Sequence, residues 1–81
     1  MDITAYCPTG NPTASGVYPT EGRTVACDHL PFGTRVRVNG HVYIVEDRFG
    51  AGHNDKLDIF MESYDRAIEW GRKRLWVEIM D

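Results

Sequence analysis

The chain has 81 residues, of which nine are basic and twelve acidic, and its net charge is −3. This length suits a single domain spanning residues 1–81 with a small hydrophobic core. The negative charge argues against nucleic acid as the main partner, and no apolar run reaches the roughly 20 residues that span a membrane.

The first third of the chain combines two short strands with irregular segments. Residues 3–7 and 23–27 carry the β-branched, aromatic and small apolar side chains typical of strands. Residues 8–16 between them are rich in proline, glycine, threonine and asparagine, which indicates a loop. A proline and a glycine within residues 30–34 predict a sharp change in backbone direction.

Residues 34–46 contain the clearest local signal, a predicted β-hairpin. Asn39 and Gly40 are flanked by alternating apolar residues, which is typical of a two-residue turn. This turn sets a register in which Val36 faces Tyr43. Alternation then predicts one shared face, continued at the strand end by Asp47, that consists of Val36, Val38, Tyr43 and Val45.

The next expected strand, residues 57–61, carries an aspartate among apolar side chains. Leu57 and Ile59 fall on one face, so Asp58 and Phe60 fall on the other. A carboxylate beside an aromatic ring is partly removed from water. Its pKa is therefore raised, as a general acid requires.

The C-terminal part predicts one helix and a closing strand. Residues 63–70 suit a helix, with Ser63 as the N-cap and Gly71 as the C-cap. The buried face of this helix is expected to comprise Tyr64, Ala67, Ile68 and Gly71. Residues 73–80 suit a strand with Leu75, Val77 and Ile79 on one face. The total is a mainly β fold, a small barrel of six strands with one short α-helix.

The two cysteines, Cys7 and Cys27, are too few and too widely spaced for a zinc knuckle. One alternative is a disulfide that closes a loop of about 20 residues and stabilises the fold by roughly 3 kcal/mol. The other is a pair of buried thiols that pack as small apolar side chains. Both stay open, because the cellular compartment decides between them.

Three aspartates stand where predicted strands meet loops: Asp28, Asp47 and Asp58. A single aspartate at such a junction is more often a turn or capping residue than a catalyst. Three of them around one proposed cleft favour a functional site, because loops carried on rigid strands are where such sites usually lie.

The order of several motifs resembles the 3D domain, a family named for its three aspartates. The motifs are TAY at residues 4–6, TASG at 13–16, VACD at 25–28, LPFGT at 30–34, ED at 46–47, LDIF at 57–60 and AxxWG at 67–71. The 3D domain is in turn similar to the catalytic barrel of membrane-bound lytic transglycosylase A and to RlpA-like and expansin-like barrels.

The resemblance implies a six-stranded double-psi β-barrel that acts on the glycan strands of peptidoglycan. The three family aspartates correspond to Asp28, Asp47 and Asp58, and Asp58 holds the position of the catalytic acid. The implied reaction cleaves the bond from N-acetylmuramic acid to N-acetylglucosamine without water and leaves a 1,6-anhydromuramoyl end. Expected substrate-binding residues are Tyr6, Thr13, Thr34, Arg48 and His53.

Two alternatives to a lytic transglycosylase stay open, and the first is motivated by departures from the family pattern. The loop at residues 48–54 and His29 differ from the usual family sequence. A non-catalytic glycan-binding module of the expansin-like kind is one alternative. The other is a glycoside hydrolase in which a second carboxylate, from Asp47 or Asp28, activates water.

We expect no cofactor and no required metal. His53 with Asp47, Asp55 and Asp58 offers metal-ligand types, but an isolated loop histidine is usually solvated. The expected place of action is the cell wall or the extracellular space. The N-terminus lacks the pattern of a signal peptide, which fits a domain excerpt or delivery of the phage and holin type. The expected assembly is a monomer or a dimer that exchanges elements.

Overall fold

The structure is a computed structural model that describes residues 1–50, 52 and 55–80. It is mainly β, with seven strands in one sheet and a single helix in the described residues. The strands are β1 (Asp2–Tyr6), β2 (Thr24–Ala26), β3 (Arg35–Val38), β4 (His41–Asp47), β5 (Lys56–Phe60), β6 (Lys73–Arg74) and β7 (Glu78–Ile79), and the helix is α1 (Tyr64–Trp70).

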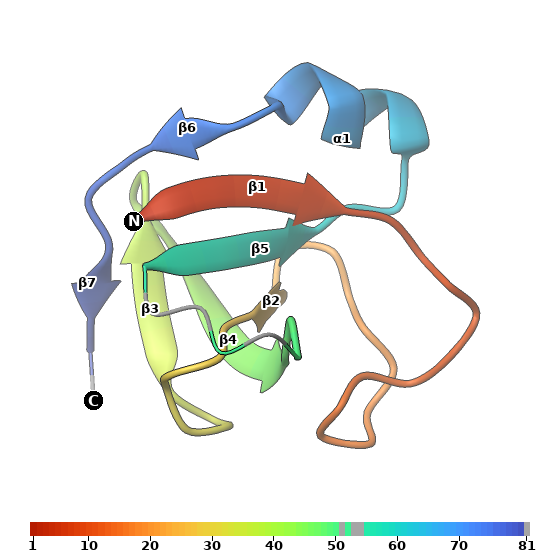
Figure 1. Cartoon of the computed structure of the whole chain (residues 1–81), viewed down its shortest axis with the longest axis horizontal. Coiled ribbons are helices and arrows are strands. Elements are labelled where there is room, and N and C mark those ends of the chain that lie inside the picture. The colour runs from red at the N-terminus through yellow and green to blue at the C-terminus, as the bar shows by residue number, and fades with distance from the viewer. Residues whose placement is uncertain (51, 53–54, 81) are drawn as a thin grey trace.

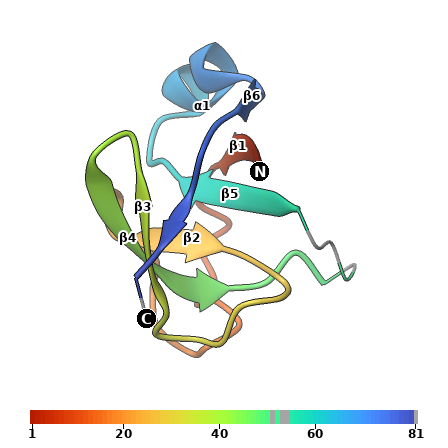
Figure 2. The same cartoon turned by 90° about the vertical axis from the view of Figure 1, so that its left-hand side faces the viewer.

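The sheet has the order β6-β1-β5-β2-β4-β3-β7 and is curled into a half-barrel (Figures 1 and 2). Pairing is parallel for β1 with β5 and for β2 with β4, whereas β2 and β5 run antiparallel. The two edge strands, β6 and β7, are joined by residues 75–77 alone. Because so short a link reaches at most about 14 Å, the two edges of the sheet must lie close together.

The core lies inside the curl and is built by the five long strands and the residue after β2. Its side chains are almost completely buried, and they are aliphatic apart from one thiol. The cluster comprises Ile3, Val25, Cys27, Val36, Val38, Val45, Leu57 and Ile59. On β5 the alternation of faces is the predicted one, since Leu57 and Ile59 enter the core and Asp58 does not.

The predicted hairpin is confirmed in both its turn and its register. Val36 pairs with Tyr43 across β3 and β4. Asn39 and Gly40 have φ angles of 51° and 77°, the left-handed region that a type I′ turn requires. The expected six strands become seven, because the predicted strand at residues 73–80 is interrupted at residues 75–77.

The predicted helix is confirmed, but its predicted buried face is wrong. Ser63 is the N-cap, accepting a hydrogen bond from the backbone N–H of Arg66 at 3.3 Å. Only Ala67 is buried, whereas Tyr64 and Ile68 are 69% and 62% exposed. The cause is geometric, because a helix of seven residues that packs on β1 has only a narrow strip in contact with the sheet.

Both cysteines are free thiols, so the alternative of a Cys7–Cys27 disulfide is wrong. Cys7 follows β1 and Cys27 follows β2, and β5 lies between these strands. Two strand spacings of about 4.8 Å separate the chains by more than the roughly 7 Å that a disulfide allows between Cα atoms. The Cys27 thiol lies instead 3.3 Å from Nδ1 of His29.

Within the part of the chain that the structure describes, no helix is long and apolar enough to cross a membrane.

Candidate active site

The sheet brings Asp58 and Asp47 to either side of one small residue. Strand β2 lies between β5 and β4, and Ala26 pairs with Asp58 on one side and with Asp47 on the other. Paired residues of neighbouring strands project from the same face of a sheet. The small side chain of Ala26 therefore lies between the positions of the two carboxyl groups.

A bulge in the β2–β4 pairing is what places Asp47 there. Val25 pairs with Val45, but Ala26 pairs with Asp47 rather than with Glu46. One extra residue reverses the face to which every later side chain points. The expectation that Asp47 continues the Val45 face is therefore wrong. Asp47 turns away from the core toward the face that carries Asp58.

Asp58 is half-buried and has one described hydrogen-bond donor to its side chain. The hydroxyl of Thr4, its parallel partner on β1, donates to Oδ1 at 2.8 Å. Burial raises the pKa of Asp58, the Thr4 hydrogen bond lowers it, and the negative charge of Asp47 raises it; the balance is a raised pKa. The carboxyl group thus holds a proton more firmly than an ordinary aspartate does.

Asp47 has a different environment, because three donors converge on its carboxylate. The phenol of Tyr6 donates to Oδ2 at 3.1 Å. The backbone N–H groups of Ala14 and Arg48 both donate to Oδ1, each at 2.9 Å. Charge-assisted hydrogen bonds of this kind fix the position of a carboxylate.

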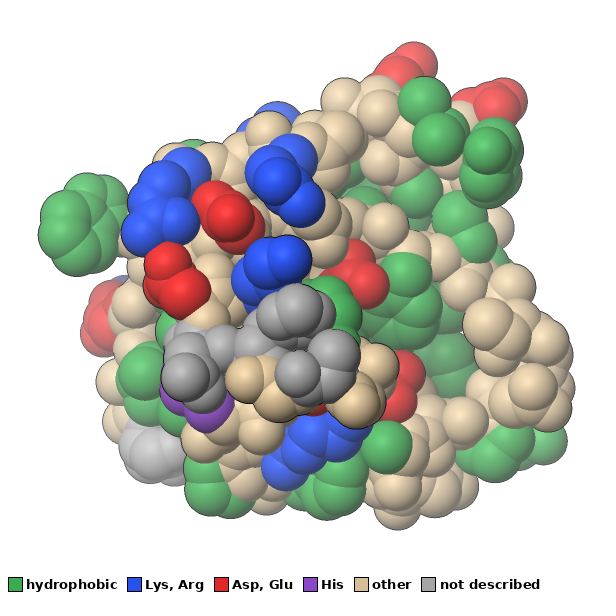
Figure 3. Space-filling view, viewed as in Figure 1, with side chains coloured by type: hydrophobic (Ala, Val, Ile, Leu, Met, Phe, Trp, Pro, Cys, Tyr) green, Lys and Arg blue, Asp and Glu red, His purple; other side chains and the backbone are tan. Residues whose placement is uncertain are grey.

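Tyr6 connects Asp47 to the end of β5. Burial raises the pKa of Tyr6, and the charge of Asp47 together with its hydrogen bond raises it further. The phenol therefore stays neutral and acts as a donor. Its ring packs edge-on against Phe60, with centroids 5.4 Å apart at an angle of 70°. Figure 3 shows a hollow in this part of the surface, with hydrophobic side chains in it and acidic side chains beside it.

Asp28 acts on the backbone of the loop that follows Asp47. Its Oδ1 accepts hydrogen bonds from the N–H groups of Phe49 at 2.7 Å and Gly50 at 3.1 Å. This geometry fixes the start of the loop directly beside Asp47. The described contacts therefore give Asp28 an organising position, whereas Asp47 and Asp58 form the central pair.

The order of these aspartates along the chain matches a known family. The sequence model of the 3D domain matches residues 23–81. The chain belongs to the 3D domain family. That family is associated with peptidoglycan-related function of the lytic transglycosylase type. No curated protein matches the chain.

Among the other predicted ligand contacts in this 3D domain, Arg48 is engaged with the protein itself. Its guanidinium donates to the carbonyl of Cys27 at 2.6 Å and lies 3.9 Å from the centre of the Phe32 ring. Arg48 therefore ties the loop after β4 to the loop after β2. His53 lies outside the described residues.

Thr13 and Thr34 are each only 7% exposed. The hydroxyl of Thr13 donates to the carbonyl of Val17 at 2.8 Å, which closes the turn whose Ala14 N–H binds Asp47. The backbone of Thr34 stands at the foot of the hairpin, where its carbonyl accepts from Val45 N–H at 2.9 Å. Both threonines thus shape the backbone around the pair.

The sequence did not single out Thr4 as a site residue. Its role depends on the parallel pairing of β1 with β5, which joins residues 54 positions apart, and nothing in its neighbourhood along the chain indicates that pairing. In the described residues, no group of three or more His, Cys, Asp or Glu side chains could hold a metal ion. The expectation that no metal is required stays a prediction, because His53 lies outside those residues.

Proposed function

We propose that this 3D domain is a lytic transglycosylase that cleaves the bond from N-acetylmuramic acid to N-acetylglucosamine in peptidoglycan. The observation that carries the proposal is the contrast between the two central aspartates. Burial raises the pKa of Asp58, which has one described side-chain donor, whereas Asp47 receives three donors. The Asp58 carboxyl group is suited to carry a proton, whereas the Asp47 carboxylate is held in a fixed position by its donors.

The reaction needs one group that first gives and then takes a proton. Protonated Asp58 donates its proton to the glycosidic oxygen, and the bond from that oxygen to C1 of the muramoyl residue breaks. The 6-hydroxyl of the same muramoyl residue then forms a bond to C1 and gives its proton to the Asp58 carboxylate. The products are a free 4-hydroxyl on N-acetylglucosamine and a 1,6-anhydro ring. No water is consumed, and Asp58 ends protonated.

The neighbours of Asp58 support this cycle without taking part in the proton transfer. The charge of Asp47 raises the pKa of Asp58 and is suited to stabilise positive charge that develops at C1. The Thr4 hydroxyl holds Oδ1, which fixes the orientation of the carboxyl group. Because Asp47 is already held by Tyr6 and two backbone donors, it is poorly placed to activate water as a second base. The arrangement therefore favours transglycosylation over hydrolysis.

The test is digestion of purified peptidoglycan, followed by mass spectrometry of the soluble muropeptides. We expect 1,6-anhydromuramoyl ends from the wild-type chain and none from Asp58→Asn, which keeps the shape and the acceptor for Thr4. Asp65→Asn, on the exposed helix surface, is the matched control and should retain activity. Digestion in ¹⁸O-labelled water separates the alternatives, because reducing ends carrying the label would establish a hydrolase.

The non-catalytic alternative has its own outcome in the same experiment. If the wild-type chain sediments with insoluble peptidoglycan and releases no soluble product, the chain is a glycan-binding module and the proposed chemistry is wrong. Circular dichroism of Asp58→Asn shows whether the variant is folded. The proposal places the action of this domain at the cell wall, where its substrate is found.

A further inference from the structure

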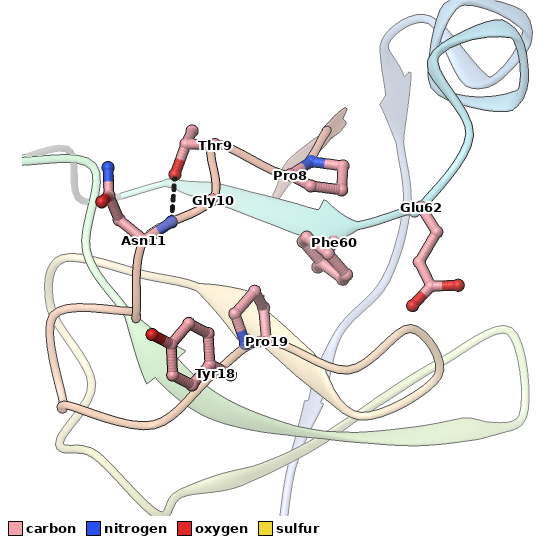
Figure 4. Close-up of a pocket in the computed structure, with 8 residues that line it drawn as sticks. All are labelled: Pro8, Thr9, Gly10, Asn11, Tyr18, Pro19, Phe60 and Glu62. Atoms are coloured by element: carbon pink, nitrogen blue, oxygen red, sulfur yellow. Dashed lines mark hydrogen bonds between the residues drawn. The ribbon is translucent and has the colours of Figure 1, made fainter.

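A groove lies next to the central aspartate pair, at the end of β5. It has a volume of about 190 Å³ and lies between the loop after β1, the loop before β2 and the end of β5 (Figure 4). Rings and the backbone of the first loop form most of its wall, and one carboxylate side chain lies at its side. The lining residues are Pro8, Thr9, Gly10, Asn11, Tyr18, Pro19, Phe60 and Glu62.

Phe60 lines this groove and also lies next to the proposed catalytic site. Phe60 lies two residues after Asp58 on the same face of β5, so the two positions are about 6.6 Å apart along the strand. The ring of Phe60 also contacts Tyr6, whose hydroxyl binds Asp47. A glycan held with its bond to be cleaved at Asp58 would therefore extend its next sugar toward the groove.

The walls of the groove are held in place from outside. The guanidinium of Arg23 donates to the carbonyl of Tyr18 at 3.2 Å, which fixes the backbone beneath a side chain that is 67% exposed. The N–H of Glu62 donates to Glu21 at 2.7 Å, and Glu21 also forms an ion pair with Arg66. The groove is thus a preformed surface, and the aromatic ring of Tyr18 is accessible to a ligand in it.

We propose that this groove binds the N-acetylglucosamine residue that leaves in the reaction, with Tyr18 as the stacking residue that determines its position. The inference rests on the proposed function. The C–H faces of a sugar pack on aromatic and proline rings, and its hydroxyl and amide groups pair with backbone polar groups and with the Glu62 carboxylate. Among the described residues that line the groove, Glu62 is the one that carries a charge. A neutral sugar suits this surface, and a muramoyl residue with its acidic peptide does not.

The first measurement is binding without cleavage, in the Asp58→Asn background. The probe is a peptide-free tetrasaccharide of alternating N-acetylglucosamine and N-acetylmuramic acid, titrated into ¹⁵N-labelled protein. We expect the amide signals of Gly10 and Asn11 to shift. We also expect Tyr18→Ala to weaken binding by about ten-fold, which corresponds to about 1.4 kcal/mol. Tyr64→Ala removes a tyrosine that is 69% exposed and does not line the groove, and it should leave the affinity unchanged.

The second measurement is turnover with Asp58 intact. We expect Tyr18→Ala to lower kcat/KM by about ten-fold, mainly through KM, and Tyr18→Phe to retain most of it, because the ring rather than the hydroxyl makes the contact. Equal affinities for Tyr18→Ala and Tyr64→Ala, or shifts confined to residues away from the groove, would overturn the inference. If these results accompany cleavage that depends on Asp58, the proposed function stands. If Asp58→Asn cleaves normally, the proposed function fails, and the titration still decides whether the groove binds the sugar.

Discussion

Asp58→Asn and Asp47→Asn should change the stability of the fold in opposite directions. Asp58 is half-buried, and burial, which penalises the charged carboxylate, is the main reason that its pKa is raised. Asp58→Asn removes the buried charge and keeps an oxygen to accept the Thr4 hydrogen bond. Asp47→Asn instead weakens three hydrogen bonds that a carboxylate accepts. The first variant should unfold at a higher temperature than the wild type and the second at a lower one.

The size of each effect follows from the surroundings of the carboxyl group. For Asp58→Asn we expect a gain of about 0.5–1 kcal/mol, after allowing for the water that reaches this partly exposed group. For Asp47→Asn we expect a loss of about 1–2 kcal/mol, because hydrogen bonds to a charged acceptor are about twice as strong as neutral ones. In a domain of this size, 1 kcal/mol shifts the Tm by about 4–8 °C.

The pH dependence of the Asp58→Asn effect provides an internal check. Because the folded chain has the raised Asp58 pKa, it binds a proton more readily than the unfolded chain does. The ionised carboxylate therefore opposes folding above the folded-state pKa, and this cost is absent below the ordinary carboxyl pKa of about 4. The stability difference between wild type and Asp58→Asn should shrink as the pH falls toward that value.

Thermal unfolding followed by circular dichroism at several pH values measures both effects. The wild type, Asp58→Asn, Asp47→Asn and the surface control Asp65→Asn should be compared in the same buffers. A fall in Tm for Asp58→Asn as large as that for Asp47→Asn would refute the reasoning. It would mean that the Asp58 carboxylate stabilises the fold through its contacts, as Asp47 does. Asp58 would then not be a candidate for the group that carries the proton.

Two further variants test the supports of the pair. Thr4→Val removes the hydrogen bond that lowers the pKa of Asp58. The limb of the pH–kcat/KM profile at which Asp58 loses its proton should therefore move to higher pH. If this limb does not move, it belongs to another group. Asp28→Ala removes the carboxylate that accepts hydrogen bonds from the N–H groups of Phe49 and Gly50. Limited proteolysis should then cut the chain near residue 50 faster, and activity should fall. An unchanged cleavage pattern would show that Asp28 does not order this loop.

The elements that the sequence predicted well are those that local chemistry decides. The hairpin register depends on Asn39 and Gly40, which occupy left-handed conformations that few other residues adopt. The helix limits depend on Ser63 and Gly71, and both act as caps. In each case the deciding residues lie within a few positions of the structure that they determine.

The elements that it missed depend on contacts between distant segments. Thr4 meets Asp58 only because β1 pairs in parallel with β5. Tyr64 and Ile68 looked internal from their spacing, yet spacing cannot tell how much of a short helix its sheet covers. The closing strand was predicted as continuous, but residues 75–77 must cross from one edge of the curled sheet to the other.

The position of Asp47 shows how an irregularity in a sheet can complete a site. Strict alternation along β4 would put Asp47 on the core side with Val45, where an ionised carboxylate would be costly to bury. The bulge opposite Ala26 uses one extra residue to turn Asp47 to the face of Asp58. At this position the Asp47 carboxylate also accepts the hydrogen bond from the Ala14 N–H. A bulge that only relieved strain would not need to align with Ala26, whereas this one sets two carboxyl groups of unlike environment on either side of the same small residue.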